Sequence, residues 1–360
     1  MKVSINTFYR ESHAGAVLQA YALARTLKAL GHEPEMVAYD RPPRGGGRKT
    51  IKQRIMALAI HEAETFRQYA AFRARFLRES GTVFDSYEEI ANNPPRTDAY
   101  VCGSDQIWNP GLLAGNRFDP AYFLQFGPAT VPRISYAASF GGYQPGAEEE
   151  SLLRTYLSSF SAISVREPAA QAMLSKILGR EVALTLDPTL LVNDYSELLQ
   201  PSASAGKYVL LYALQNSAEI RQAARDVANY YSLPIWSAGG PLLPWKVLGR
   251  RIETRGPLQW INLINGAAAV VTNSFHGLVF SLLLKKRVVL TPLTGSVASR
   301  NNRMTHLCAV LGVREQVASV DPRRSLVKEM NWDAVDSNLS EQRGASLAFL
   351  VSALPAANSC

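Results

Sequence analysis

This chain has few cysteines and no long apolar run. Its only cysteines are Cys102, Cys308 and Cys360, with no CxxC pair among them. That number and spacing favour neither a disulfide framework nor a zinc site, and a reducing compartment fits best. The sequence also lacks an apolar run of the roughly 18 residues that a membrane span needs. Its first residues contain no apolar core of signal-peptide length, so we expect a cytoplasmic protein.

The usual short signatures of catalysis and metal binding are missing as well. The chain has no GxxxxGK[ST] phosphate loop, no HExxH pair and no GxSxG elbow. Its five histidines and three cysteines show no ligand spacing, so we expect no metal site. The composition, 47% apolar and 19% charged, fits a folded protein with a sizeable core. A chain of 360 residues has room for about two domains.

Positive charge is concentrated in one stretch of the chain. Residues 41–80 hold ten basic and three acidic side chains, which is seven of the net charge of +8. Apolar residues at helical spacing from 51 to 77 predict one or two basic amphipathic helices there. They are interpreted either as a surface helix docked on the sheet or as a contact with an anionic membrane surface or lipid pyrophosphate. We expect no nucleic-acid partner, because no recognisable binding motif accompanies the charge.

The order of the expected elements indicates an α/β fold with parallel sheets. A strand at residues 2–6, a helix at 14–30 and a strand at 35–39 form a βαβ opening. Strand and helix patterns alternate up to about residue 200 and begin again near residue 208. We therefore predict two doubly wound, Rossmann-like domains that face a cleft.

The expected domain bounds follow from the breaks in this alternation. The first domain covers residues 1–200 and includes the basic stretch 41–80, and the second covers 207–330. Serine, alanine and glycine at 201–206 mark the expected linker, and 331–360 is expected to form a helical tail.

The segment VVTNSFHGLVFSLLL, residues 270–284, is the most informative part of the second domain. An apolar strand ends at Thr272 and a helix begins near His276. In parallel sheets ligands bind at the carboxyl ends of strands, and a helix N-terminus there suits a phosphate or carboxylate. Either Asn273 or Ser274 can cap the helix. We expect a functional role for His276, with a packed or solvated side chain as the alternative.

Two motifs follow expected strands of the first domain. In SVRE, Arg166 stands at a strand end, where it can hold a carboxylate or phosphate in a two-pronged contact. The alternative for Arg166 is a surface ion pair with Glu167, which would contribute little. GSDQIWN, residues 103–109, mixes polar side chains with Trp108, as sugar sites commonly do. Within it Asp105 is expected either to orient or deprotonate a hydroxyl or to cap a helix.

Three further positions have weaker patterns. Arg300 and Arg303 open the last expected helix of the second domain, where their charge opposes the helix dipole. Either an anionic ligand holds them there or they form a solvated basic turn. Asp187 precedes a proline after an expected strand and is expected to form a turn.

Taken together, these motifs resemble the polysaccharide pyruvyl transferase family. Some members have a basic residue where Ser274 stands, so Arg300 or Arg303 is expected to supply that charge. The opening motif often reads Asn-Tyr-Gly where this chain has HAG at 13–15. The resemblance runs through residues 1–312 in the family's order, in HAGAVLQAYAL (13–23), VCGSDQIWNP (101–110), ISYAASFG (134–141), SVRE (164–167), LDPTLL (186–191), VTNSFHG (271–277) and RNNRM (300–304).

The resemblance implies a two-domain enzyme of the GT-B type, with the acceptor side in the first domain and the donor side in the second. Phosphoenolpyruvate is the implied donor substrate, with no cofactor, and the acceptor is a free or lipid-linked sugar of a cell-surface polysaccharide or exopolysaccharide precursor. The product is a pyruvate ketal. His276 is the expected general acid and Asp105 the expected base. The expected substrate contacts are Arg166, Asn273, Ser274, Gly277, Arg300, Arg303, Ser104, Gln106 and Gly15.

Two other functions remain as alternatives. The first is a glycosyltransferase of the same architecture that uses a nucleotide sugar, although VTNSFHG contains no acidic residue for a donor ribose. The second is a non-catalytic scaffold that binds a polysaccharide precursor, for which the basic stretch 41–80 is equally suited.

Overall fold

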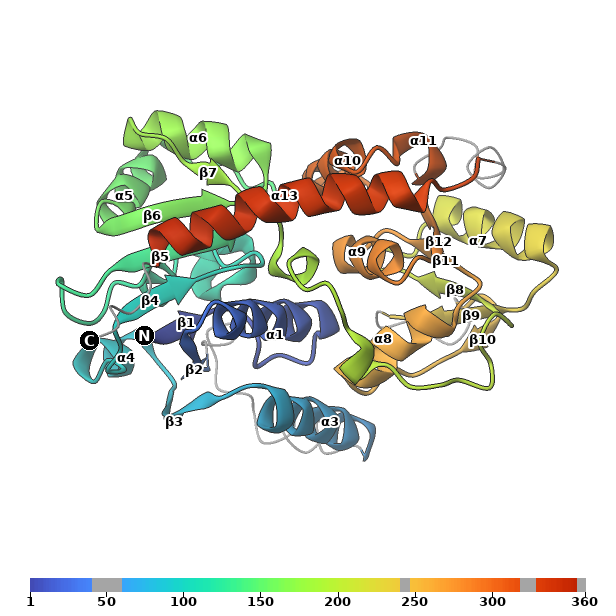
Figure 1. Cartoon of the computed structure of the whole chain (residues 1–360), viewed down its shortest axis with the longest axis horizontal. Coiled ribbons are helices and arrows are strands. Elements are labelled where there is room, and N and C mark those ends of the chain that lie inside the picture. Colours follow the sequence, from blue (N-terminus) through green and yellow to red (C-terminus); the bar gives the residue numbers. More distant parts are fainter. Residues whose placement is uncertain (41–59, 240–246, 318–327, 355–360) are drawn as a thin grey trace. The chain divides into compact units, whose positions relative to one another are not determined.

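The computed structural model describes residues 1–40, 60–239, 247–317 and 328–354 (Figure 1). The chain divides into two compact units, Met1–Val192 with Gln342–Cys360, and Asn193–Glu341. The division falls before the expected linker at 201–206, and the last helix belongs partly to each unit.

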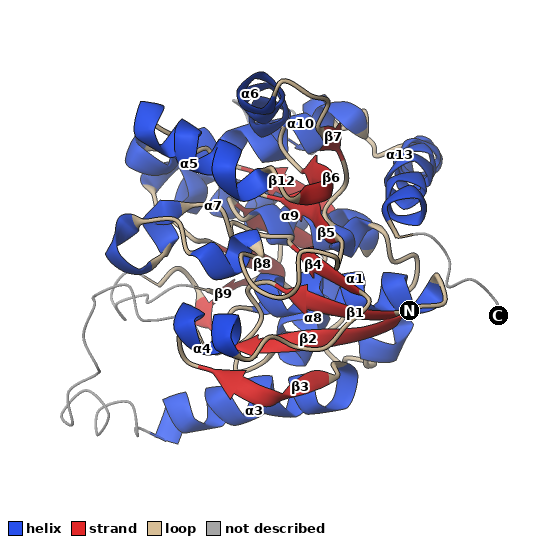
Figure 2. Cartoon of the chain, turned by 90° about the vertical axis from the view of Figure 1, so that its left-hand side faces the viewer, coloured by secondary structure: helices blue, strands red, loops and turns tan. Residues whose placement is uncertain are grey.

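The first unit is built on a seven-stranded sheet in which neighbouring strands pair in parallel. The strand order is β3-β2-β1-β4-β5-β6-β7. Figure 2 shows these strands in that order, with α1 on one face of the sheet and α5 and α6 on the other. Because crossovers between parallel strands are right-handed, a helix lies on one face when the next strand is added on one side of the sheet and on the opposite face when it is added on the other side. Here the chain adds β2 on one side of β1 and adds β5 to β7 on the other. The strands are β1 (Lys2–Asn6), β2 (Glu33–Tyr39), β3 (Glu79–Phe84), β4 (Ala99–Cys102), β5 (Arg133–Ala138), β6 (Phe160–Val165) and β7 (Ala183–Leu184).

The helices of this unit begin and end at recognisable signals. His13 caps the first helix, because its Nδ1 accepts from the Ala16 N–H at 3.2 Å. Gly31, with a φ of +84°, follows that helix, as the sequence predicts. The helices are α1 (Ala14–Ala29), α3 (Ile60–Phe76), α4 (Tyr87–Asn92), α5 (Ala147–Leu157) and α6 (Pro168–Leu178).

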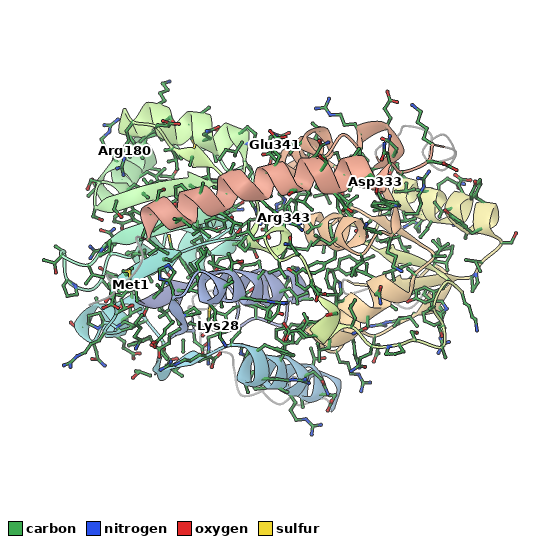
Figure 3. All side chains as sticks on the ribbon, viewed as in Figure 1. Met1, Lys28, Arg180, Asp333, Glu341 and Arg343 are labelled. Carbon is green, nitrogen blue, oxygen red and sulfur yellow. The ribbon has the colours of Figure 1, made fainter. Side chains whose placement is uncertain are left out.

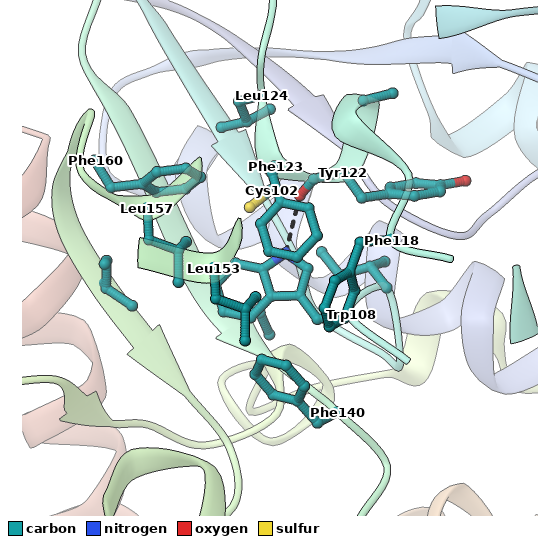
Figure 4. Close-up of a cluster of buried hydrophobic side chains, with 14 of the residues drawn as sticks. Cys102, Trp108, Phe118, Tyr122, Phe123, Leu124, Phe140, Leu153, Leu157 and Phe160 are labelled. Carbon is teal, nitrogen blue, oxygen red and sulfur yellow. Dashed lines mark hydrogen bonds between the residues drawn. The ribbon is translucent and has the colours of Figure 1, made fainter. Parts of the chain in front are cut away.

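Trp108 lies in the aromatic core of the first unit rather than at a binding surface. It is 0% exposed, its ring stacks on Phe123 at 5.2 Å between centroids, and its Nε1 donates to Tyr122 O at 3.0 Å (Figure 4). The aromatic residue of GSDQIWN is therefore a core residue. Its indole fills the space between the sheet and α5, where Leu153 and Leu157 also lie.

The basic stretch is described only from residue 60 onward. Its first part, residues 41–59, lies outside the described residues, and α3 confirms a helix in the second part. Three of its arginines face acids. Arg67 pairs with Glu64 at 2.5 Å, Arg73 with Glu79 at 3.1 Å, and Arg78 with Glu35 at 3.6 Å.

The second unit is built on a five-stranded sheet whose neighbours also pair in parallel. The strand order is β10-β9-β8-β11-β12. Two parallel, doubly wound sheets confirm the predicted fold class, while the expected cleft stays a prediction. The elements are β8 (Val209–Tyr212), α7 (Ala218–Tyr231), β9 (Ile235–Ala238), β10 (Arg250–Arg251), α8 (Pro257–Gly266), β11 (Ala269–Thr272), α9 (Phe275–Leu283), β12 (Arg287–Leu290), α10 (Asn301–Val310) and α11 (Arg314–Val317).

The last helix, α13 (Trp332–Ala353), contributes to both units. Asp333 and Arg343 lie at different turns along it (Figure 3). In the second unit, Asp336 pairs with Lys285 at 2.7 Å. In the first, Arg343 Nε donates to Leu190 O at 2.5 Å and Ser346 Oγ accepts from the Leu186 N–H at 3.0 Å. The first unit is therefore made of two separate pieces of the chain.

Candidate functional site

The first sheet reverses its direction of growth between β1 and β4. β2 and β3 continue it on one side, and β4 to β7 continue it on the other. In open parallel sheets ligands bind at such a reversal, outside the carboxyl ends of the strands. The loop that precedes α1 and the loop at 103–108 after β4 border this point. Of the expected site residues of the first unit, Ser104, Asp105 and Gln106 lie in the loop after β4, and Gly15 lies in the first turn of α1.

Buried hydrogen bonds hold the two loops together. Gln19 Nε2, on α1, donates to Thr7 Oγ1 and to Phe8 O, at 3.0 Å in each case. Gln19 Oε1 accepts from the Ser104 N–H at 3.1 Å, and Thr7 Oγ1 donates to Ser104 O at 3.1 Å. Ser104 and Gly15 are buried, so in this structure they belong to the buried support beneath the two loops.

Gln106 is fixed by the turn that follows β5. Its Oε1 accepts from Asn109 Nδ2 at 3.0 Å. Gly141 lies against this amide with a φ of +62°, and a Cβ at Gly141 would come within 1.9 Å of Gln106 Oε1. Glycine is required at that position by both its backbone conformation and the lack of space. Gln106 is therefore also part of this buried support.

The guanidinium of Arg166 is the centre of a buried ion cluster. Its Nη1 lies 2.5 Å from Asp187 Oδ2, its Nη2 3.3 Å from Asp105 Oδ1 and its Nε 3.3 Å from Glu167 Oε1. The side chains are 2% exposed for Arg166, 0% for Asp187, 7% for Glu167 and 13% for Asp105. Burial lowers the pKa of Arg166, but the three carboxylates raise it by more, so that pKa lies above its ordinary value.

This cluster differs from what the sequence predicts for two of its members. The expected ion pair between Arg166 and Glu167 is present, but it is buried and not at the surface. Asp187 forms the expected turn, since its Oδ1 accepts from the Thr189 N–H at 3.1 Å, and it binds Arg166 as well. Sequence reasoning missed this second contact, because nothing in the local pattern reports which strand ends meet.

The second sheet reverses between β8 and β11, where Asn273 joins the two strand ends. Asn273 Oδ1 accepts from the Leu214 N–H at 2.8 Å, and its Nδ2 donates to Gln215 O at 2.6 Å. Both polar atoms of its side chain thus form hydrogen bonds with backbone groups of the loop after β8. The expected substrate contact through this side chain stays a prediction, and the geometry shows a structural brace.

Ser274 and Gly277 set the start of α9. Ser274 Oγ accepts from the Gly277 N–H at 3.3 Å, which confirms one of the two predicted caps. A Cβ on Gly277 would lie 2.6 Å from Thr272 Oγ1 and 3.1 Å from the Tyr212 ring. Gly277 therefore lets the first turn of α9 approach β8 and β11 closely. Burial raises the pKa of Tyr212 to about 12, so its hydroxyl stays protonated beneath this turn at neutral pH.

His276 and Arg303 both lie against Phe275. The Phe275 and His276 ring centroids are 5.3 Å apart, and Arg303 Cζ lies 5.1 Å from the Phe275 ring centroid. Both side chains are buried, and Arg303 comes from the first turn of α10. Arg300, which is half-buried, ends the short helix before α10. The structure thus brings together a histidine, an arginine and the N-terminus of α9.

Within residues 1–40, 60–239, 247–317 and 328–354, no group of three or more His, Cys, Asp or Glu side chains is arranged so that it could hold a metal ion. Over the same ranges, the helices are too short or too polar to cross a bilayer.

Solved structures of other proteins have similar folds. MnaA of S. aureus, solved with UDP, has a TM-score of 0.56 and is 13% identical, with 98% of this chain and 95% of that chain covered. The UDP-GlcNAc 2-epimerase of Methanocaldococcus jannaschii, in complex with UDP-GlcNAc and UDP, has a TM-score of 0.50 at 13% identity, with 98% and 99% covered. At such low identity the likeness concerns the fold, and it supports the GT-B-like architecture.

Sequence comparison is more specific than these structural likenesses. No curated protein sequence matches the chain significantly. A family model for polysaccharide pyruvyl transferase, however, matches residues 13–292, which is well over half of the chain. The motifs from HAGAVLQAYAL to VTNSFHG all lie within that match. The chain therefore belongs to the polysaccharide pyruvyl transferase family.

Proposed function

We propose that this transferase moves the pyruvate unit of phosphoenolpyruvate onto a sugar of a cell-surface polysaccharide or its precursor and closes it as a ketal. Family membership supports the class of reaction. The observation that supports an anionic donor is the meeting of Arg303 and His276 at Phe275, beside the N-terminus of α9. Phosphoenolpyruvate carries about three negative charges, which guanidinium groups and helix N-termini are suited to bind.

In the proposed reaction the second unit binds the donor. Arg303, with Arg300 nearby in sequence, faces its phosphate or carboxylate, and His276 gives a proton to the methylene carbon. That proton makes C2 electrophilic, and a sugar hydroxyl attacks it. Phosphate leaves with the C–O bond electrons, and a second hydroxyl closes the ketal. Of the two hydroxyl protons, one replaces the proton given to carbon and the other leaves with phosphate.

In the same proposal the first unit binds the acceptor, and Asp105 accepts a hydroxyl proton. Asp105 is the most exposed carboxylate of the Arg166 cluster, which supports this choice. The scheme uses no cofactor and no metal ion, so turnover should survive chelation. We further propose a lipid-linked acceptor, from the charge of residues 41–80. Binding to anionic vesicles that does not weaken with salt, or that survives neutralisation of Arg44, Arg48 and Lys49, would exclude it.

Calorimetric titration with phosphoenolpyruvate, and separately with a UDP-sugar, tests the donor. Arg303→Gln should weaken phosphoenolpyruvate binding about tenfold or more, because a charged hydrogen bond contributes more than about 1.4 kcal/mol. His276→Gln should retain binding and lose turnover. Arg251→Gln is the matched control, since Arg251 is an exposed arginine on β10 at the far edge of the same sheet.

The same titration separates the alternatives. Binding of the UDP-sugar alone would replace our proposal by a glycosyltransferase that uses a nucleotide sugar. Binding of neither ligand, with the acceptor present, would favour a scaffold that handles the polysaccharide precursor.

A further inference from the structure

The Arg166 cluster contains more negative charge than its guanidinium can balance. One cation faces three carboxylates, all on buried or nearly buried side chains. Carboxylates this close oppose each other's ionisation, and a shared proton relieves the repulsion. The distribution of contacts shows which of the three carboxylates is able to share that proton.

Asp187 is committed to its ionised form by its contacts. Its Oδ2 lies 2.5 Å from Arg166 Nη1 and 3.1 Å from Ser104 Oγ. Its Oδ1 accepts from the Thr189 N–H at 3.1 Å and from Thr189 Oγ1 at 2.6 Å. A carboxylate that accepts this many hydrogen bonds is strongly favoured in its charged state. Asp187 therefore anchors the guanidinium and leaves the remaining proton to Asp105 and Glu167.

Asp105 and Glu167 contact adjacent nitrogens of the same guanidinium. In the planar group the Nε hydrogen and one of the two Nη2 hydrogens point to the same side, so carboxylates bound at these two nitrogens can be neighbours. Both contacts are 3.3 Å, longer than the 2.5 Å contact of Asp187. One guanidinium thus holds both Glu167 and Asp105, each through a longer contact than that of Asp187.

Ser139 connects the pair from the end of β5. Its backbone N–H donates to Asp105 O at 3.0 Å, and its Oγ donates to Glu167 Oε1. Glu167 Oε2 is buried and has no hydrogen-bond partner among the described residues. A buried carboxylate with one unused oxygen has room for a proton or a ligand hydroxyl.

We propose that Asp105 and Glu167 act as one proton-sharing acid–base pair for the acceptor hydroxyls, with Arg166 as the positioning residue that holds them together. The inference rests on the proposed pyruvyl transfer. Ketal formation requires two hydroxyls to lose a proton in turn, and a pair that already shares one proton has room for one more, so it releases the first before it accepts the second. Of the two protons released, one replaces the proton that His276 gives to carbon and the other leaves with phosphate, so the pair returns to its starting state.

This assignment gives Arg166 a role other than the expected contact with the donor. Each of its three nitrogens faces a carboxylate, and its side chain is 2% exposed. Tyr136 of β5 is a further titratable group that interacts electrostatically with Asp187. Burial raises the pKa of Tyr136 well above its ordinary value, so it stays neutral over the range in which the pair titrates.

The carboxyl carbons of Asp105 and Glu167, labelled with ¹³C, report the pair by NMR without any need for turnover. We expect both resonances to shift in the same two steps as pH falls, and Glu167→Gln to leave one step for Asp105. Independent single steps in the wild type would overturn the pair. A coupled titration in a protein that transfers nothing from phosphoenolpyruvate would instead overturn the proposed function and leave the pair standing.

Steady-state kinetics and calorimetry complete the test. Glu167→Gln should lower kcat by about 10² to 10⁴ and shift the acid limb of the pH profile, with phosphoenolpyruvate affinity unchanged. Glu150→Gln, an exposed acid of α5, is the matched control. Arg166→Lys keeps the positive charge but loses the planar set of donors that contacts the three carboxylates. It should lower kcat at unchanged phosphoenolpyruvate affinity. A tenfold loss of that affinity in folded Arg166→Lys would make Arg166 a donor contact and refute its positioning role.

Discussion

At the scale of single residues, the hydrogen bonds that a side chain already makes within the protein limit what else it is able to bind. Asn273, Gln106 and Ser104 all carry polar groups that suit a substrate, yet their hydrogen bonds go to neighbouring protein groups. Arg303 instead lies over the aromatic face of Phe275. Hydrogen bonds within the protein therefore identify Asn273, Gln106 and Ser104 as bracing residues.

Removal of Arg166 should destabilise the protein strongly. Arg166→Ala leaves Asp187 buried without its cation, and the loss of one partner of a buried ion pair costs about 3–5 kcal/mol. The free energy of unfolding from urea titration measures this loss. Arg67→Ala, which breaks the exposed pair with Glu64, should cost less than about 1 kcal/mol. Equal effects of the two substitutions would show that the cluster adds nothing to stability.

At the scale of elements, the strand ends that border each reversal are tied together by side chains. Gln19 links the loops after β1 and β4, and Asn273 links those after β8 and β11. A strand end is otherwise a place where backbone groups lack ladder partners. In both units one amide side chain meets this need and fixes the loop that borders the candidate site.

Loss of the Asn273 brace should loosen the start of α9. Asn273→Ala removes the hydrogen bonds to the Leu214 N–H and the Gln215 carbonyl, at about 0.5–1.5 kcal/mol for each bond. Hydrogen exchange of the Leu214 amide should accelerate along with a fall in the unfolding free energy. Asn229→Ala, an exposed asparagine of α7, is the control and should leave that amide protected. Unchanged protection in Asn273→Ala would assign the link to backbone packing alone.

Elements with a strong local pattern could be predicted from the sequence. The helix expected at 14–30 is Ala14–Ala29, and the strand expected at 2–6 is Lys2–Asn6. The last helix is Trp332–Ala353, within the helical tail expected at 331–360. Of the candidate site, the cap at Ser274 was predictable. The contact between Asp187 and Arg166 was not, because it depends on how two strand ends meet.

At the scale of the whole molecule, the first unit depends on the last part of the chain. Arg343, Ser346 and Phe349 contact Leu190, Leu186 and Tyr136 of that unit. Leu350 and Leu354 are buried, so the end of α13 contributes apolar area as well as hydrogen bonds.

Truncation after Glu341 should therefore weaken the first unit selectively. Thermal unfolding should begin at a lower temperature, and limited proteolysis should cut within Met1–Val192 before it cuts the second unit. A peptide of residues 342–360 added in trans should restore part of the protection. Equal cleavage of both units in the truncated protein would count against this dependence.

The divided composition of the first unit also has a consequence for biosynthesis. A ribosome releases residues 1–192 long before it releases 342–354, and the whole second unit is made in between. The first unit to emerge is thus the last to become complete, and the Leu186 N–H and the Leu190 carbonyl wait for their partners on α13 until that helix has been made. During that interval a chaperone has a ready target on the nascent chain.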